Sequence, residues 1–333
     1  MSKKIAISVI ITVLNEADSI DGLLDSLARQ TRRPDQVVVV DGGSTDGTLE
    51  RLHHQAQQAP YRLVVISLPG SNISQGRNAA IGAASGDIIA ATDAGVRLED
   101  DWLERLVAPF EAPDPPDVVS GFFVADPRSL FELALGASTL PLLQEIDPAR
   151  FAPSSRSVAF RRTAWQKVGG YPEWLDYCED LVYDFALRDA GFVFAFAPDA
   201  LAHFRPRPTL RAFFKQYYRY ARGDGKADLW IVRHLIRYGT YLVGAPLLVA
   251  LALAHHPLWW LGLAIGGLGM MRTPLRRTIP HLRDLPLRQR LAVLAWLPLI
   301  RVTGDVAKML GYPVGVFWRL RHAPAQPWSK RHI

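Results

Sequence analysis

Apolar residues gather in short uncharged runs along the first hundred positions, and more polar segments with helical spacing alternate with them. The apolar runs predict strands at 5–14, 36–41, 62–68 and 87–92. Helices are predicted at 19–30, after Asp46, and at 75–84. Alternating strands and helices form parallel sheets through right-handed crossovers, so the fold class expected is α/β, a mainly parallel sheet flanked by helices on both faces.

The run Val37–Val40 is the clearest of these strands. Four consecutive valines without a charge indicate a strand buried on both faces. The run ends at Asp41, and two glycines and a second Asp-Gly pair follow it. Ligands of open α/β sheets bind beyond the carboxyl ends of the strands, so Asp41 is expected at a binding edge.

The hydropathy pattern changes near residue 238. An apolar run at 238–254 is close to the lower length limit for a membrane-spanning helix, and a second run follows at 258–271 after His255-His256-Pro257. Arginines flank both outer sides of this pair, which predicts a membrane hairpin with both ends in the cytoplasm. The alternative is a buried helical hairpin of a soluble protein.

A third apolar region, 291–318, contains Arg301, Asp305 and Lys308. A span here would leave the basic residues that follow it outside the cell, against the usual charge bias. The region is therefore interpreted as interfacial amphipathic helix, which Pro298 would kink or break. The expected division is a catalytic domain at 1–235 and an all-α membrane region at 236–333.

Composition supports this division. The 333 residues are 49% hydrophobic and carry a formal charge of +6, with the basic clusters beside the apolar runs. That placement fits a cytoplasmic membrane face and excludes nucleic acid as the expected partner. The single cysteine, Cys178, excludes an internal disulfide framework or a cysteine zinc cluster. The first apolar run ends at Asn15-Glu16 without a small-residue cleavage site, so it is interpreted as a strand and not as a secretory signal.

Carboxylates recur where predicted strands end. Asp41 follows the second strand and Asp93 the fourth. A carboxylate there can hold a divalent cation that bridges a diphosphate, although each aspartate alone also suits a turn or a helix cap. The segment 70–78 includes Arg77 and can form a phosphate- or base-contacting turn, or simply the start of a helix.

Two later segments also carry candidate chemistry. Glu179 and Asp180 precede an amphipathic helix predicted at 181–189, where a carboxylate serves either as a general base or as a partner of the helix dipole. Further on, Gln216, Arg219 and Tyr220 share roughly one helical face. An interfacial amphipathic helix explains that face too, and it is compatible with a site role.

These motifs, in this order over about residues 6–225, resemble the inverting family 2 glycosyltransferases, whose fold is called GT-A. The resemblance implies that Asp180, with Glu179 beside it, is the catalytic base. It also implies a diphosphate or acceptor role for Gln216, Arg219 and Tyr220, where tyrosine replaces the usual tryptophan. The nucleotide-binding residues that it implies are Thr12, Asn15, Glu16, Asp41, Gly76, Arg77, Asn78 and Asp93.

The reaction that the resemblance implies is a single displacement. A hydroxyl or phosphate of an acceptor attacks a nucleotide-diphosphate sugar, with inversion. The predicted membrane tail adds the expectation that the site lies at the cytoplasmic side of the cell membrane and that the acceptor is lipid-linked or a glycan. Asp93 would be the ligand of Mn²⁺ or Mg²⁺, but Gly95 stands where the family's second metal-binding aspartate is usual, so weaker metal binding is expected. The alternative is a catalytically inactive, nucleotide-binding relative that scaffolds a glycan-assembly complex.

Overall fold

The computed structural model describes residues 5–324, which form two compact units. The first, called here the sheet unit, contains residues 5–124 and 143–204, and the second, the helical unit, contains 125–142 and 205–324. The boundary predicted at residue 235 separates a catalytic domain from a membrane region. The two compact units are defined by packing and do not test that boundary, so it stays a prediction.

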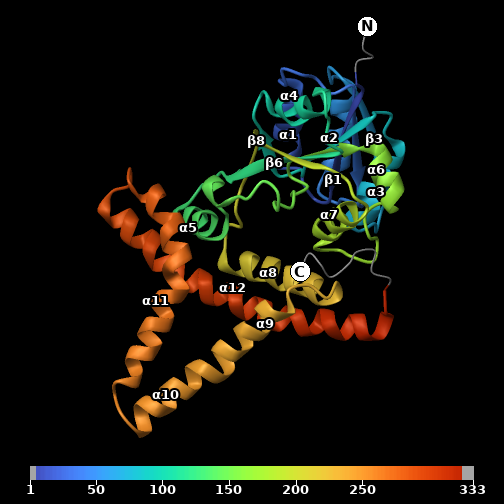
Figure 1. The fold of residues 1–333 in the computed structure, drawn as a ribbon. Coiled ribbons are helices and arrows are strands. Elements are labelled where there is room, and N and C mark those ends of the chain that lie inside the picture. The colour runs from blue at the N-terminus through green and yellow to red at the C-terminus, as the bar shows by residue number, and fades with distance from the viewer. Residues whose placement is uncertain (1–4, 325–333) are drawn as a thin grey trace. The chain divides into compact units, whose positions relative to one another are not determined.

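An eight-stranded mixed sheet forms the centre of the sheet unit, in the order β3-β2-β1-β4-β7-β6-β8-β5 (Figure 1). Strands β3, β2, β1 and β4 are parallel, while β7 is antiparallel to β4 and β6, and β5 is antiparallel to β8. The parallel part consists of the four strands predicted from the sequence, and the antiparallel part was not foreseen. The strands are β1 (Ile7–Val13), β2 (Gln36–Asp41), β3 (Arg62–Ser67), β4 (Ile88–Ala91), β5 (Val96–Leu98), β6 (Val118–Ala125), β7 (Val158–Arg161) and β8 (Phe194–Phe204).

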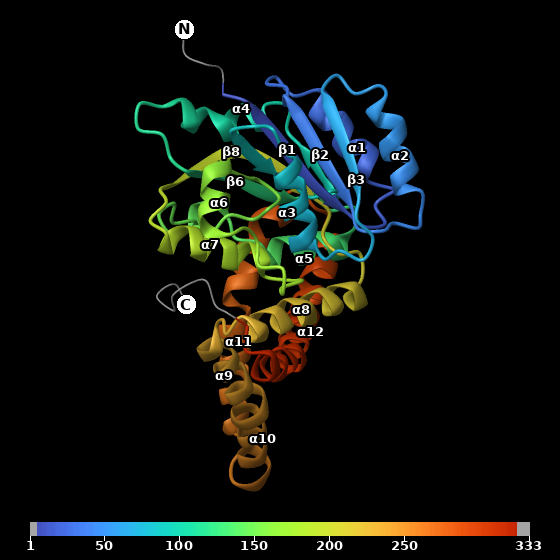
Figure 2. The same cartoon turned by 90° about the vertical axis from the view of Figure 1, so that its right-hand side faces the viewer.

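Both faces of the sheet are covered, as the four-valine run predicts. Val37 and Val39 face one apolar core and Val38 and Val40 the other, and all four are buried. Helices α1 (Ile20–Ala28), α2 (Thr48–Ala56) and α4 (Trp102–Val107) cover the first face. Helices α3 (Ile73–Ala83), α6 (Arg162–Val168) and α7 (Glu179–Asp189) cover the second (Figure 2). Single 3₁₀ turns lie at Ala108–Glu111 and Leu143–Glu145.

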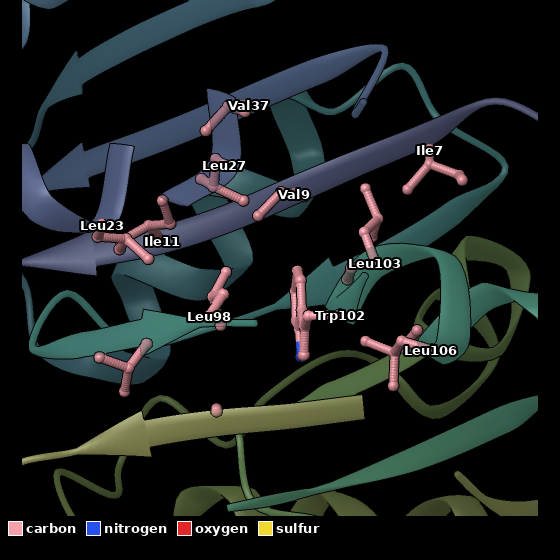
Figure 3. Close-up of a cluster of buried hydrophobic side chains, with 14 of the residues drawn as sticks. Ile7, Val9, Ile11, Leu23, Leu27, Val37, Leu98, Trp102, Leu103 and Leu106 are labelled. Atoms are coloured by element: carbon pink, nitrogen blue, oxygen red, sulfur yellow. The ribbon is translucent and has the colours of Figure 1, made fainter. Parts of the chain in front are cut away.

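Trp102 is the largest side chain of the first core. Figure 3 shows its ring among side chains of α1, α4 and β1, including Leu27, Val9 and Leu106. Its indole N–H is buried too, and it donates a hydrogen bond of 2.8 Å to Ser157 Oγ. A buried indole therefore keeps its polar atom satisfied while the ring fills the core.

The helical unit contains no strand of its own in its described residues beyond the last residue of β6. Its helices are α5 (Leu130–Thr139), α8 (Leu210–Lys226), α9 (Ile231–Tyr238), α10 (Ala245–Ala254), α11 (Trp259–Thr278) and α12 (Leu287–His322), with a π-helical turn at Gly239–Gly244 and a 3₁₀ turn at Ile279–Leu282. Phe131, Phe213 and Leu297 belong to its apolar core.

Helix α12 runs without interruption through Pro298, so of the kink or break expected there the break does not occur. A proline removes one helical hydrogen bond, but packing along the helix can outweigh that loss. The packing is close because glycines of α12 touch the backbone of α8. A Cβ on Gly311 would meet the carbonyl oxygen of Tyr218, and a Cβ on Gly315 that of Arg222.

Among the described residues, one continuous helix has the length and apolar composition of a membrane span. It is Ile231–Ala254, made of α9, the π-helical turn and α10. Its apolar side chains are largely exposed within the helical unit, Leu242 and Leu253 among them. A core helix of a soluble protein is mostly buried, and this one is not.

Candidate active site

Asp41 is the last residue of β2, and its buried carboxylate organises the loop that follows. It accepts hydrogen bonds from the backbone N–H groups of Gly43 and Ser44, each at 3.0 Å to Oδ2. Gly43 has a φ of +102°, a conformation that favours glycine. The carboxylate thus lies at the end of a parallel strand, where a ligand of such a sheet binds.

The loop after β1 is joined to this turn. Asn15 has a positive φ of 57°; its N–H donates to Ser44 Oγ at 2.8 Å and its Oδ1 accepts from Thr45 N at 2.9 Å. Glu16 N donates to Thr48 Oγ1 at 2.9 Å. The two loops that the resemblance assigns to the nucleotide are therefore held together by their own hydrogen bonds.

Helix α3 carries three further predicted residues, Gly76, Arg77 and Asn78. Asn72 caps the helix by accepting from Gln75 N at 2.9 Å, so the ordinary helix start considered for this segment is present. Gly76 packs against Thr12 of β1, since a Cβ there would lie 2.9 Å from Thr12 Cγ2. A glycine at this position lets the helix approach the strand closely.

Asn78 connects α3 to the segment before α7. Its Nδ2 donates to the carbonyl oxygen of Tyr171 and to Glu173 Oε1, at 2.9 and 3.0 Å. Its Oδ1 accepts from Tyr171 N and from Trp165 Nε1, at 2.8 and 3.1 Å. The amide thus makes four hydrogen bonds within the protein, and its predicted nucleotide contact stays a prediction.

Arg77 is buried between two carboxylates. Its Nη1 is 2.5 Å from Glu179 Oε1 and its Nη2 is 3.1 Å from Asp93 Oδ1, while its own side chain is 5% exposed. Burial disfavours the charged guanidinium, but the carboxylates of Glu179 and Asp93 outweigh it and raise the pKa of Arg77. The arginine therefore joins the end of β4 to the start of α7.

The two candidate catalytic acids lie in the first turn of α7, which begins at Glu179 and not after Asp180. Cys178 precedes them with a φ of 63°, so the chain enters the helix through a left-handed residue. Burial, and after it the carboxylate of Asp180, raise the pKa of Glu179 to about 7 against the opposing effect of Arg77. Asp180 is more exposed than Glu179, and its predicted role as the catalytic base stays a prediction.

A third acid of α7, Asp184, was not singled out from the sequence. It is buried, and its Oδ2 has no hydrogen-bond partner among the described residues. Burial and the Asp180 carboxylate raise its pKa well above the usual range for aspartate. The spacing Asp180-x-x-x-Asp184 on a predicted helix was the available signal for this pair.

Asp93 lies beyond the end of β4, and guanidinium groups face both of its oxygens. Arg77 contacts Oδ1, and Arg156 Nε is 3.7 Å from Oδ2. Within residues 5–324 no group of three His, Cys, Asp or Glu side chains could hold a metal ion. With Gly95 in place of a second carboxylate, this donor set does not fit a divalent cation held by the protein alone.

Gln216, Arg219 and Tyr220 all lie on α8 of the helical unit. Gln216 Nε2 donates to the Tyr220 hydroxyl at 2.8 Å, as residues four apart on one helical face can. Their predicted role with the diphosphate or the acceptor stays a prediction.

Two family models match the chain. The model described as glycosyl transferase family 2 matches residues 8–159, and that of glycosyl transferase family group 2 matches residues 147–304. The succinoglycan biosynthesis protein ExoA of Rhizobium meliloti is 31% identical over 231 residues, which cover 66% of this chain and 68% of ExoA. Glycosyltransferase AglE of Haloferax volcanii is 27% identical over 231 residues, covering 68% of this chain and 74% of AglE.

Solved structures share the fold. The mannosyltransferase PcManGT of Pyrobaculum calidifontis, in complex with GDP-Man and Mn²⁺, aligns with a TM-score of 0.65 at 21% identity, covering 92% of this chain and 88% of that one. S. aureus TarS 1–349 in complex with UDP aligns with a TM-score of 0.51 at 18% identity, covering 96% and 92%. These likenesses confirm the predicted GT-A fold, and ExoA and the family models confirm the predicted enzyme class. The chain belongs to glycosyltransferase family 2, enzymes that use nucleotide sugars.

Proposed function

We propose that this glycosyltransferase moves a sugar from a nucleotide-diphosphate donor to a hydroxyl or phosphate of a lipid-linked or glycan acceptor, with inversion. The observation that carries the proposal is the connected set Asp93–Arg77–Glu179, which fixes the start of α7 where Asp180 lies. Positioning of this kind is a large part of what an enzyme contributes to a displacement.

In the proposed reaction, Asp180 takes the proton of the acceptor hydroxyl. The acceptor oxygen then bonds to the anomeric carbon while the bond from that carbon to the diphosphate oxygen breaks. The electron pair leaves with the nucleoside diphosphate, so a single displacement inverts the anomeric configuration. If Glu179 is protonated, Asp180 is the carboxylate of this pair that stays negative and can act as the base. Glu179 then positions the helix through Arg77 and takes no proton from the acceptor.

The donor's nucleoside is proposed to lie at the edge formed by the loops after β1 and β2, with Asp41 recognising the base. The joined loops of Asn15, Glu16 and Ser44 support this assignment, because a preorganised edge loses little entropy on binding. PcManGT was solved with GDP-Man, and TarS with UDP, so donors of both nucleotides are candidates.

A divalent cation at this site would depend on ligands from the donor. PcManGT carries Mn²⁺ in its solved complex. Here the single carboxylate Asp93 would need the donor's own phosphate oxygens as further ligands, as Mg²⁺ sites often have. When bound, a cation would supply positive charge beside the leaving diphosphate.

Membrane association is proposed through the helix Ile231–Ala254, with α11 completing a hairpin and α12 lying in the interface. Leu299, Val302, Val306, Leu310, Val314 and Phe317, all of them exposed, form a stripe on α12 with spacings of three and four residues. Basic residues beside these helices favour a catalytic domain on the cytoplasmic side. The relative ExoA is named a succinoglycan biosynthesis protein, and on that basis we propose a cell-envelope glycan, lipid-linked or free, as the acceptor class.

Donor turnover by the full chain in detergent tests this function. Release of nucleoside diphosphate is measured with a panel of UDP- and GDP-sugars, with and without a lipid phosphate or a glycan acceptor, and the product's anomeric configuration is read by NMR. Turnover is expected with one donor, and it should be lost in Asp180→Asn but kept in the control Asp199→Asn, an exposed aspartate of β8. Donor binding without turnover for every acceptor would favour the inactive scaffold instead.

A further inference from the structure

We propose that Arg156 binds the donor's diphosphate and supplies there the positive charge that a metal held by two aspartates would otherwise provide. This inference rests on the proposed function, because it assigns a residue to the diphosphate part of the same site. Neither the motifs in the sequence nor the family resemblance points to Arg156.

The position of Arg156 is fixed on several sides. Its backbone carbonyl accepts a hydrogen bond of 3.0 Å from Thr92 Oγ1, next to Asp93 in the chain. Its guanidinium carbon is 4.6 Å from the ring centre of Phe204 and 5.6 Å from that of Phe123. Aromatic faces hold a guanidinium in place, and its N–H groups can still donate to a ligand at its edge. The side chain is 23% exposed, so it is held and still reachable by solvent.

Its contact with Asp93 is close but exchangeable. The 3.7 Å between Arg156 Nε and Asp93 Oδ2 is an ion-pair distance and longer than a hydrogen bond. Arg77, in contrast, contacts Glu179 and Asp93 at hydrogen-bond distance and is almost fully buried. Arg156 Nη1 also donates a hydrogen bond of 3.1 Å to Ser154 Oγ, but the Arg156 side chain is 23% exposed against 5% for Arg77. Of the two arginines beside Asp93, Arg156 is therefore the one that an arriving anion can reach.

The contacts of Asp93 make it a poor ligand for a divalent cation, whereas the guanidinium of Arg156 suits an anion. A divalent ion at Asp93 would have to displace two guanidinium groups from the carboxylate, with no second carboxylate at Gly95 to compensate. A diphosphate, in contrast, can bind to a guanidinium directly, because the planar group donates two parallel hydrogen bonds to phosphate oxygens. The same contact strengthens as negative charge develops on the leaving group.

Calorimetry on the EDTA-treated full chain in detergent tests the assignment, with UDP and GDP as probes and uridine and guanosine as probes that lack the diphosphate. The wild type is expected to bind one nucleoside diphosphate without added cation. Arg156→Gln should weaken that binding tenfold or more and leave binding of the matching nucleoside unchanged, while Arg156→Lys recovers part of the loss. A melting curve for each variant controls for folding.

Arg161→Gln is the matched control. Arg161 is also half-buried, lies 3.6 Å from an aspartate, Asp117, and has its guanidinium 5.6 Å from the ring centre of Phe110, but it is on β7 away from Asp93. The Arg161→Gln variant should bind the nucleoside diphosphate and the matching nucleoside as the wild type does. Binding that vanishes in EDTA, returns with Mn²⁺ and ignores Arg156→Gln would overturn this inference alone. Absence of nucleotide binding under every condition would overturn the proposed function with it.

Discussion

Arg77 and Glu179 form an ion pair of 2.5 Å although 102 positions separate them in the chain. Both side chains are almost fully buried, and the same guanidinium reaches Asp93. A buried charge that loses its partner costs far more than an exposed one, since water cannot replace the partner. The pair therefore couples the stability of the sheet unit to the geometry of the candidate active site.

Replacing Arg77 by methionine should destabilise the sheet unit by about 3–5 kcal/mol at pH 8, where the wild type pairs an ionised Glu179 with Arg77 and the variant must either leave that buried carboxylate unpaired or bind a proton to it. At pH 5.5 the loss should be smaller, because Glu179 is then protonated. Urea unfolding at the two pH values measures both. Arg51→Met is the control: its pair with Asp21 is exposed, and its removal should cost less than about 1 kcal/mol. Equal losses at the two pH values would contradict the coupling.

The pH dependence of stability should carry a contribution from Glu179 with a defined sign. Its pKa is about 7 in the folded protein and near 4.5 in the unfolded chain, so the folded state binds the extra proton between these values. The free energy of unfolding should therefore fall as pH rises from about 4.5 to 7, by up to about 3 kcal/mol from this group. Asp184 contributes in the same direction, and the measurement is accordingly the difference between wild type and Glu179→Gln. That variant should show a shallower fall; an unchanged slope would show that Glu179 is ionised throughout.

Asp41→Asn should weaken nucleoside binding about tenfold, because a charged acceptor contributes more than a neutral one to a hydrogen bond with a base. The amide oxygen can still accept from Gly43 and Ser44, so the loop should persist. Calorimetry with uridine and guanosine measures the effect. Asp35→Asn is the control, as Asp35 lies just before β2, at the opposite end of the strand from Asp41. Wild-type affinity in Asp41→Asn would remove this residue from the base site.

The parallel part of the fold could be predicted because a local run of apolar residues identifies each of its strands. Val37–Val40 needs no partner to be recognised, and β2 has the predicted bounds, Gln36–Asp41. Strand β8 was missed because Pro198 and Asp199 interrupt its apolar run, while β5 and β7 are only three and four residues long. Their pairing depends on long-range contacts that no local pattern encodes.

The candidate site likewise contains residues that a local pattern identifies and partners that only the folded structure brings to them. Asp41 ends β2, Asp93 lies beyond β4 and Asp180 lies in the first turn of α7, and a motif marks each of them in the sequence. The partners that give them their chemistry come from elsewhere in the chain: Arg156 reaches Asp93 from a loop 63 positions away, counted from 93 to 156. Pro298 failed as a helix-break signal for a related reason, because helix–helix packing outweighed a local propensity.

The glycines between α8 and α12 should resist even a single added methyl group. In Gly311→Ala the new Cβ meets the backbone of Tyr218, which cannot move as a side-chain tip can, and a loss of about 1–3 kcal/mol is expected. Thermal unfolding of the full chain in detergent is the measurement. Gly267→Ala in α11 is the control, since nothing lies within 4 Å of its added Cβ, and it should be neutral or stabilised through helix propensity. Matching melting temperatures in the two variants would exclude a tight α8–α12 contact.

The proposed membrane arrangement predicts that the helix Ile231–Ala254 and helix α12 lie at different depths in the bilayer. A fluorophore on Leu247→Cys, within the helix Ile231–Ala254, should be quenched most by lipids labelled deep in their acyl chains. One on Leu310→Cys, in the exposed stripe of α12, should be quenched most by lipids labelled near the headgroup, because an in-plane helix reaches only the upper part of the acyl region. Both variants are made in a Cys178→Ser background, so that each protein has one thiol.

The control for depth is Val193→Cys, an exposed position before β8 in the sheet unit, which should be quenched by iodide in water and not by labelled lipid. If Leu310 gave the deep profile of Leu247, α12 would span the bilayer, and the charges of Arg301 and Asp305 would lie inside it as a buried pair at 2.9 Å. If both positions gave the aqueous profile of Val193, the apolar helices would be covered by protein, and the soluble-hairpin alternative would replace the membrane arrangement. The in-plane reading requires the two labelled helices to differ from each other and from the control.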